Sequence, residues 1–124
     1  MGDGAMTRAL TKGVALAVLF ANLPAWAEQR IYTGNTMGVG SGRCATYKMD
    51  MEVVVDGTAV NGRIKQQGRP DRNFNATLAT GGMLKTKVAV GGDGSMDVIG
   101  TINDKEARVL LDGYCKFDFR LTPK

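Results

Sequence analysis

The sequence predicts an all-β protein, a single small antiparallel meander of seven or eight strands that closes into a β-barrel or folds into a two-layer sandwich. Three observations predict it. Beyond residue 44, apolar residues recur at every second position, which is the period of half-buried strands. Glycine-, asparagine- and aspartate-rich turn sequences separate these stretches. No segment after residue 27 carries the 3.6-residue pattern of a long amphipathic helix.

The first 27 residues are predicted to form a secretory signal peptide, cleaved after Ala27. Arg8 and Lys12 supply the positive start, residues 13–21 supply an apolar core, and Ala-Trp-Ala precedes the cleavage point. The apolar run is too short for a permanent membrane-spanning helix. We therefore expect a periplasmic or secreted protein without stable membrane insertion.

Residues 28–43 are predicted to be a glycine-rich lead-in to the disulfide-closed domain, which covers residues 44–124. A short strand is expected around Arg30-Ile31-Tyr32. Four glycines between residues 34 and 42 then predict a mobile loop.

Cys44 and Cys115 are the only cysteines, and export would carry them into an oxidising compartment. We predict that they form a disulfide across the seam between the first and last strands. Closing a loop of about 70 residues contributes about 4 kcal/mol in the chain-entropy model. Cys44 has the parity of outward-facing residues, so a bulge or a strand start is predicted between Cys44 and Tyr47.

The first predicted hairpin turns at Asp56-Gly57, a strong two-residue turn signal. This turn sets Asp50 opposite Arg63 and Val53 opposite Val60, which keeps polar and apolar residues on separate faces. The inward residues of the two strands are predicted to be Tyr47, Met49, Met51, Val53, Val55, Val60, Gly62 and Ile64.

The next two strands are predicted to form a second hairpin, with a glycine bulge near Gly81-Gly82 that sets Leu78 against Leu84. Three further strands follow, separated by a loop at residues 91–94 and turns near residues 103–106 and 112–114. The inward residues of these five strands are predicted to be Phe74, Ala76, Leu78, Leu84, Thr86, Val88, Val90, Met96, Val98, Gly100, Ile102, Val109, Leu111, Cys115, Phe117, Phe119 and Leu121. Glycines within strands, such as Gly62 and Gly100, are typical of the sharply curved strands of small barrels.

Catalytic chemistry has little support in this composition. The chain has no histidine, which removes the commonest general base and every Ser-His or Cys-His pair. Its two serines, Ser41 and Ser95, lie in glycine-rich stretches. Asp50 and Glu52 share a strand face, but an ion-paired solvated surface explains them better than glycoside chemistry. We expect no enzymatic activity and no cofactor.

Two groups of residues contain metal-ligand types, and neither predicts a metal site. Met49 and Met51 are soft ligands suited to Cu(I), yet their shared inward face favours core packing. Weak calcium binding by Asp93, Asp97 and Asp104 lacks the repeated motif that such sites use.

The feature that most favours binding is a set of basic residues on the predicted second to fourth strands and the loop between two of them. If these strands are neighbours, their outer face forms a basic surface over asparagines and a threonine, though a solvated sheet face is the simpler explanation. The candidate basic binding face consists of Arg63, Lys65, Arg69, Arg72, Lys85 and Lys87. Its expected partner is an exported protein or an anionic envelope component, not nucleic acid, because stacking aromatics are missing.

In architecture the chain resembles the small exported bacterial β-barrels that inhibit lysozymes or proteases. It lacks the serine-glycine-x-arginine-tyrosine loop of the lysozyme inhibitors, and its one tryptophan, Trp26, lies in the signal peptide. The expected function is therefore a non-enzymatic binding module. The alternatives are a hydrolase inhibitor acting through residues 66–72 or 91–95, and a carrier of a small apolar ligand inside the barrel.

Overall fold

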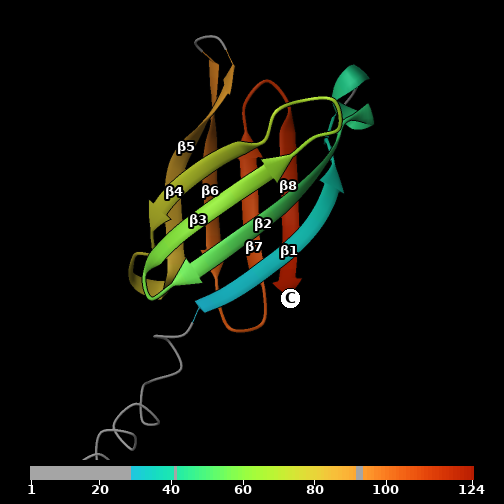
Figure 1. Cartoon of the computed structure of the whole chain (residues 1–124). Coiled ribbons are helices and arrows are strands. Elements are labelled where there is room, and N and C mark those ends of the chain that lie inside the picture. Colours follow the sequence, from blue (N-terminus) through green and yellow to red (C-terminus); the bar gives the residue numbers. More distant parts are fainter. Residues whose placement is uncertain (1–28, 41, 92–93) are drawn as a thin grey trace, which may run out of the picture.

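A computed structural model describes residues 29–40, 42–91 and 94–124 of the chain. These residues form eight antiparallel strands in one nearly closed, barrel-like sheet (Figure 1). The predicted all-β class is thus confirmed. The predicted signal peptide lies outside the described residues.

The strands follow one another with short connections. Their bounds are β1 Gln29–Met37, β2 Lys48–Asp56, β3 Ala59–Lys65, β4 Arg72–Thr77, β5 Met83–Gly91, β6 Gly94–Ile102, β7 Ala107–Asp112 and β8 Lys116–Pro123. Two short 3₁₀ segments, η2 (Gly42–Thr46) and η3 (Thr80–Gly82), interrupt the meander.

The sheet consists of two four-stranded meanders joined through the first and last strands. Its hydrogen-bonded order is β4-β3-β2-β1-β8-β7-β6-β5. Figure 1 shows β1–β4 crossing in front of the layer that contains β6–β8. β4 and β5 form the two edges of this order and lie against each other without a hydrogen-bonded ladder. The barrel is therefore open between β4 and β5 and joined between β1 and β8.

β1 corrects the expectation of a short strand followed by a mobile loop. It pairs with β2 along its full length, from Gln29 opposite Asp56 to Met37 opposite Lys48. It also pairs with the end of β8. A Cβ on Gly34 would lie 2.9 Å from the Arg120 carbonyl oxygen. The glycine thus permits close packing of β1 on β8, so glycines in this segment mark strand packing and not a mobile loop.

The first hairpin forms with the predicted faces but a different register. Asp56 pairs with Ala59, and the turn consists of Gly57 and Thr58, with Gly57 at φ 64°. Asp50 lies opposite Lys65, two positions from the predicted Arg63. Because side chains alternate with period two, a shift of two positions preserves both faces.

The predicted second hairpin forms only at its turn. A single bridge pairs Ala79 with Met83 around η3, in the register that sets Leu78 against Leu84, and no ladder continues along β4 and β5. Gly81 and Gly82 both have positive φ, and Gly82 lies against the Ile102 carbonyl at the end of β6. This contact directs β5 onto β6. A bulge does occur, but near the far end of β5, between Ala89 and Gly91.

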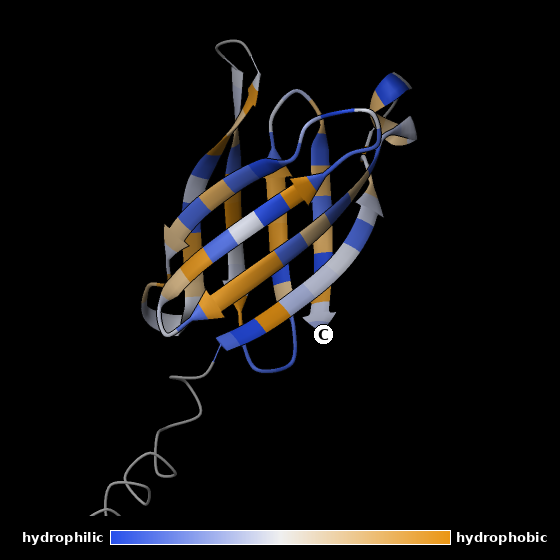
Figure 2. Cartoon of the chain, viewed as in Figure 1, coloured by the Kyte–Doolittle hydropathy of each residue, from blue (hydrophilic) through white to orange (hydrophobic). Residues whose placement is uncertain are grey.

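The inward faces of the strands form one hydrophobic core, and Figure 2 shows the corresponding alternation of hydrophobic and hydrophilic residues along β2 and β3. Phe74 covers Gly62, its cross-strand partner, which explains one of the glycines within strands. The predicted inward residues are buried or packed against the core at most positions. The fully buried large side chains are Tyr32, Met51, Val53, Val55, Val60, Val88, Val98, Val109, Leu111, Phe117, Phe119 and Leu121.

One end of the barrel is closed by the β6–β7 connection. The Tyr32 hydroxyl donates a 2.7 Å hydrogen bond to the Asn103 carbonyl, and Arg30 forms a 3.0 Å ion pair with Asp104. The Asn103 side-chain oxygen accepts hydrogen bonds from the amides of Lys105 and Glu106. These contacts fix the loop over this end of the core.

The predicted disulfide between Cys44 and Cys115 is present, with 5.4 Å between the two Cα atoms. Cys44 lies in η2, before β2 begins at Lys48, so the predicted strand start is confirmed. Val39 pairs with Lys116 beside the disulfide. The disulfide therefore links η2, which connects β1 and β2, to the residue just before β8, at the end of the barrel opposite the β6–β7 connection.

Candidate binding site at the disulfide end

The disulfide end of the barrel contains a surface hollow of about 330 Å³, here called the barrel-end hollow. β2, the β3–β4 connection, the β5–β6 hairpin and the β7–β8 turn contribute to it. Its lining residues are Tyr47, Met49, Gln66, Arg69, Arg72, Val90, Gly94, Ser95, Met96, Tyr114, Cys115 and Phe117.

The floor of the barrel-end hollow belongs to the hydrophobic core. Met49, Met96 and Phe117 are all buried inward residues of strands. Val90 is partly buried and packs against the same core. Core packing holds these side chains in place, so the apolar floor exists before any ligand arrives.

The basic rim comes from the connection between β3 and β4. The Arg69 amide donates a 3.0 Å hydrogen bond to the Gln66 carbonyl, and Gly68, the third residue of this turn, has φ 81°. A turn of this kind needs positive φ at its third position, which glycine supplies without strain. Pro70 restricts the backbone that follows. Arg72 then begins β4 opposite Ile64. The two arginines are therefore held by an ordered connection.

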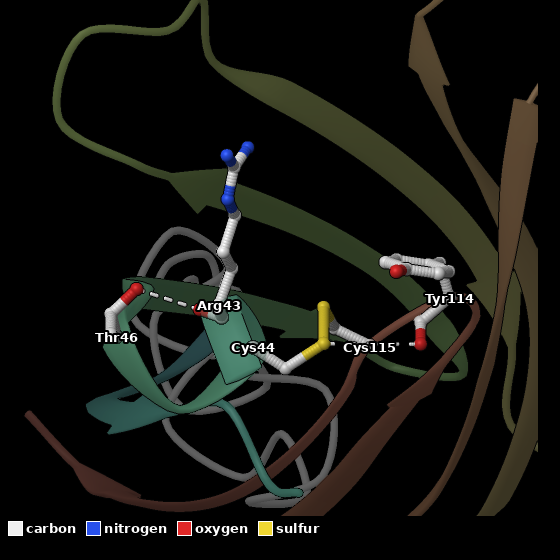
Figure 3. The surroundings of a disulfide bond; sticks show 5 residues. All are labelled: Arg43, Cys44, Thr46, Tyr114 and Cys115. Atoms are coloured by element: carbon white, nitrogen blue, oxygen red, sulfur yellow. Dashed lines mark hydrogen bonds between the residues drawn. A yellow bond between two sulfur atoms is a disulfide. The ribbon is translucent and has the colours of Figure 1, made fainter. Parts of the chain in front are cut away.

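Tyr114 stands at the edge of the barrel-end hollow next to the disulfide (Figure 3). Its side chain is 99% exposed, although both neighbours in the chain are constrained. Cys115 is covalently bound to Cys44, and the Gly113 amide donates to the Cys115 carbonyl at 3.2 Å. The backbone on both sides of Tyr114 is thus constrained, and a solvent-exposed aromatic at such a position is typical of binding surfaces.

On the Cys44 side, the disulfide is anchored in η2, which is itself held by hydrogen bonds. Thr46 donates a 2.7 Å hydrogen bond to the Arg43 carbonyl, which closes the short helical turn (Figure 3). The Gly38 amide donates to the Tyr47 carbonyl at 2.9 Å, and Gly38 has no room for a side chain beside Cys44. Tyr47 is thereby fixed where it lines the barrel-end hollow.

The structure distributes the six candidate basic residues over three places. Arg69 and Arg72 line the barrel-end hollow. Arg63 lies opposite Glu52 and Lys65 opposite Asp50 on the outer face of β2 and β3. The two lysines of β5, Lys85 and Lys87, line a separate hollow with Asp97.

Lys87 is engaged within the sheet. Its ammonium group lies 2.6 Å from a carboxylate oxygen of Asp97 on β6. This hydrogen bond, the attraction of the Lys87 charge and a smaller attraction from Lys85 lower the pKa of Asp97 from 3.8. The β5 lysines thus lie beside an anion of the protein itself.

The metal hypotheses find no assembled ligand set in the part of the chain that the structure describes. Met49 and Met51 are both buried in the core. Asp97 and Asp104 are ion-paired on different elements, and Asp93 lies outside the described residues. No group of three histidine, cysteine, aspartate or glutamate side chains gathers among residues 29–40, 42–91 and 94–124.

Sequence reasoning found half of this site. It named residues 66–72 and 91–95 as binding loops, and their described parts border the same hollow. It placed Tyr114 in a turn without assigning it a role. The available signal was an aromatic residue in a predicted turn, adjacent to a disulfide cysteine. That Met49 and Met96 also line the hollow could not be predicted, because it depends on which strand ends meet at the disulfide end of the barrel.

Comparison of the chain with protein-family models, curated proteins and solved structures finds no match. No helix within the described ranges is long and apolar enough to span a membrane.

Proposed function

We propose that this protein is an exported, non-enzymatic binding module whose binding site is the barrel-end hollow. The observation that carries the proposal is the combination of a preformed apolar floor with a rim that bears Arg69, Arg72 and the exposed Tyr114. The disulfide supports export, because such bonds persist mainly in oxidising compartments. The lack of histidine supports a binding role over catalysis.

Inhibition of an exported hydrolase is the second candidate, and Tyr114 favours it. Protein inhibitors present a rigid loop to their target, and Tyr114 is held in the open by a disulfide. Residues 66–72 lie across the same hollow, so the two segments form one continuous contact surface. Carriage of an apolar ligand inside the barrel has less support, since large core side chains such as Tyr32, Phe117 and Phe119 occupy its interior.

The proposal is tested by capturing partners from an envelope extract with three forms of the exported protein. One is the unchanged protein, the second carries Arg69→Gln, Arg72→Gln and Tyr114→Ser, and the third carries Lys85→Gln and Lys87→Gln. We expect the hollow variant to lose the captured partner and the β5 variant to retain it. Captured material is then assayed for hydrolase activity with and without the protein.

Equal capture by all three forms would place the binding surface elsewhere. Loss of capture in the β5 variant alone would assign binding to Lys85 and Lys87. Capture of an active hydrolase that the protein slows would favour the inhibitor reading.

A further inference from the structure

We propose that the barrel-end hollow binds a small amphipathic carboxylate, with the carboxylate at Arg69 and Arg72 and the apolar body on the methionine and phenylalanine floor. This inference rests on the proposed function and specifies the chemistry of the ligand. It follows from the charge of the hollow, its floor and its size.

The charge of the barrel-end hollow sets it apart from four other hollows on the described surface. Each of those four contains at least one carboxylate beside its basic residues, and the acidic residues concerned are Asp50, Glu52, Asp97, Asp104 and Asp118. Among the described residues, the lining of the barrel-end hollow has two arginines and no aspartate or glutamate. No carboxylate in this described lining competes with an external anion for the two arginines.

Arg69 and Arg72 have no ion-pair partner among the residues that the structure describes. Arg108 and Arg120, on the opposite layer, have Asp118 at 3.8 Å and Glu106 at 3.6 Å. A guanidinium group binds a carboxylate through two parallel hydrogen bonds, which gives both affinity and orientation. Each rim arginine can thus form a bidentate hydrogen-bonded pair with a ligand carboxylate.

The floor selects an apolar body for the same ligand. Met49 and Met96 contribute polarisable thioether side chains and Phe117 contributes an aromatic ring, and all three are held in the core below the hollow. The two tyrosines, Tyr47 and Tyr114, flank this floor. The hollow's volume of about 330 Å³ lies at the small end of ligand sites, which favours a small molecule over an extended chain.

The test uses a matched series of ligands with one apolar body: octanoate, octan-1-ol and octylammonium, each kept below micelle-forming concentration. Binding to the exported, disulfide-bonded protein is followed by NMR of methionine methyl groups. Met49 and Met96 report on the hollow, and Met83, at the opposite end of β5, serves as the internal control. We expect octanoate to shift the Met49 and Met96 signals and leave Met83 unchanged. Octanol and octylammonium should bind at least about tenfold more weakly than octanoate.

Two variants complete the test. Arg69→Gln with Arg72→Gln should weaken octanoate binding by about tenfold or more and leave octanol binding unchanged. Arg108→Gln with Arg120→Gln removes the same charge from the other layer and should change neither. This matched pair separates a local contact from the effect of net charge.

Equal binding of octanoate and octanol would overturn the carboxylate assignment and leave the hollow as a binding site. The carboxylate assignment is also overturned if the Arg69/Arg72 and the Arg108/Arg120 double variants weaken octanoate binding equally. If none of the three ligands shifts Met49 or Met96, the amphipathic ligand class is wrong. The proposed function then stands or falls on the capture experiment alone.

Discussion

Glycines within strands are needed for close packing in this fold, because a side chain at these positions would collide with neighbouring atoms. Gly100 on β6 faces the backbone of β7, and a Cβ there would collide with the Arg108 carbonyl. Gly62 on β3 leaves room for the Phe74 ring instead. The same residue type thus serves a backbone approach in one strand and side-chain packing in another, which sequence periodicity cannot distinguish.

Replacing Gly100 with alanine should destabilise the protein by about 1–3 kcal/mol, because the clash is with backbone that cannot rotate away. Urea denaturation followed by circular dichroism measures the change. Thr101→Ala, an exposed neighbour on the same strand, is the control and should stay within about 0.5 kcal/mol. A Gly100→Ala protein as stable as the control would show that β6 and β7 adjust freely.

The pKa of Asp97 should rise when Lys87 is changed to glutamine. The Lys87 hydrogen bond and charge both favour the ionised carboxylate and lower its pKa from 3.8. A carboxyl with a lowered folded-state pKa adds stability above its unfolded pKa, and this stability is lost as pH falls through the folded value. An NMR titration of the Asp97 carboxyl carbon measures the shift. Lys105→Gln should leave the titration unchanged, and an unmoved pKa in Lys87→Gln would contradict the pairing.

At the level of elements, the sequence predicted which side of each strand faces the core better than it predicted which strands pair. Alternation of apolar residues identified β2, β3, β6, β7 and β8 with the correct inward sides, because period two is a local property. It failed for β1, whose glycines hid a strand paired with the end of β8. It also failed between β4 and β5, where η3 and its contact with Ile102 determine which strands pair. Pairing depends on contacts that are distant in the chain.

The open seam between β4 and β5 should appear in amide hydrogen exchange. Alternate amides on β4 face β3, and the others face the seam, where no ladder forms. Seam-facing amides should exchange at rates close to those of loops, while both sets on β2 stay protected between β1 and β3. NMR-detected exchange measures this residue by residue. Equal protection of both sets on β4 would mean that the barrel closes in solution.

At the scale of the whole molecule, the two ends of the barrel differ. One end is closed by Tyr32, Arg30 and their contacts with the β6–β7 connection. The other end carries the barrel-end hollow beside the disulfide, with an apolar floor and two arginines, whereas the hollow at the β6–β7 end has Asp104 beside Arg30 and Lys124. The sequence predicted the disulfide and two of the loops. It could not show that they meet, since that depends on how two meanders join through β1 and β8.

The disulfide should be the largest single contributor to stability outside the core. Cys44→Ala with Cys115→Ala should lower the free energy of unfolding by about 4 kcal/mol, because 71 positions separate the bridged residues and the cross-link restricts the unfolded chain. Urea denaturation followed by circular dichroism is suitable, since the only tryptophan, Trp26, precedes the predicted cleavage point. The variant should also release Tyr114, which hydrogen exchange at Gly113 and Cys115 detects. Unchanged stability together with unchanged exchange would show that packing between β1 and β8 fixes this end of the barrel without the disulfide.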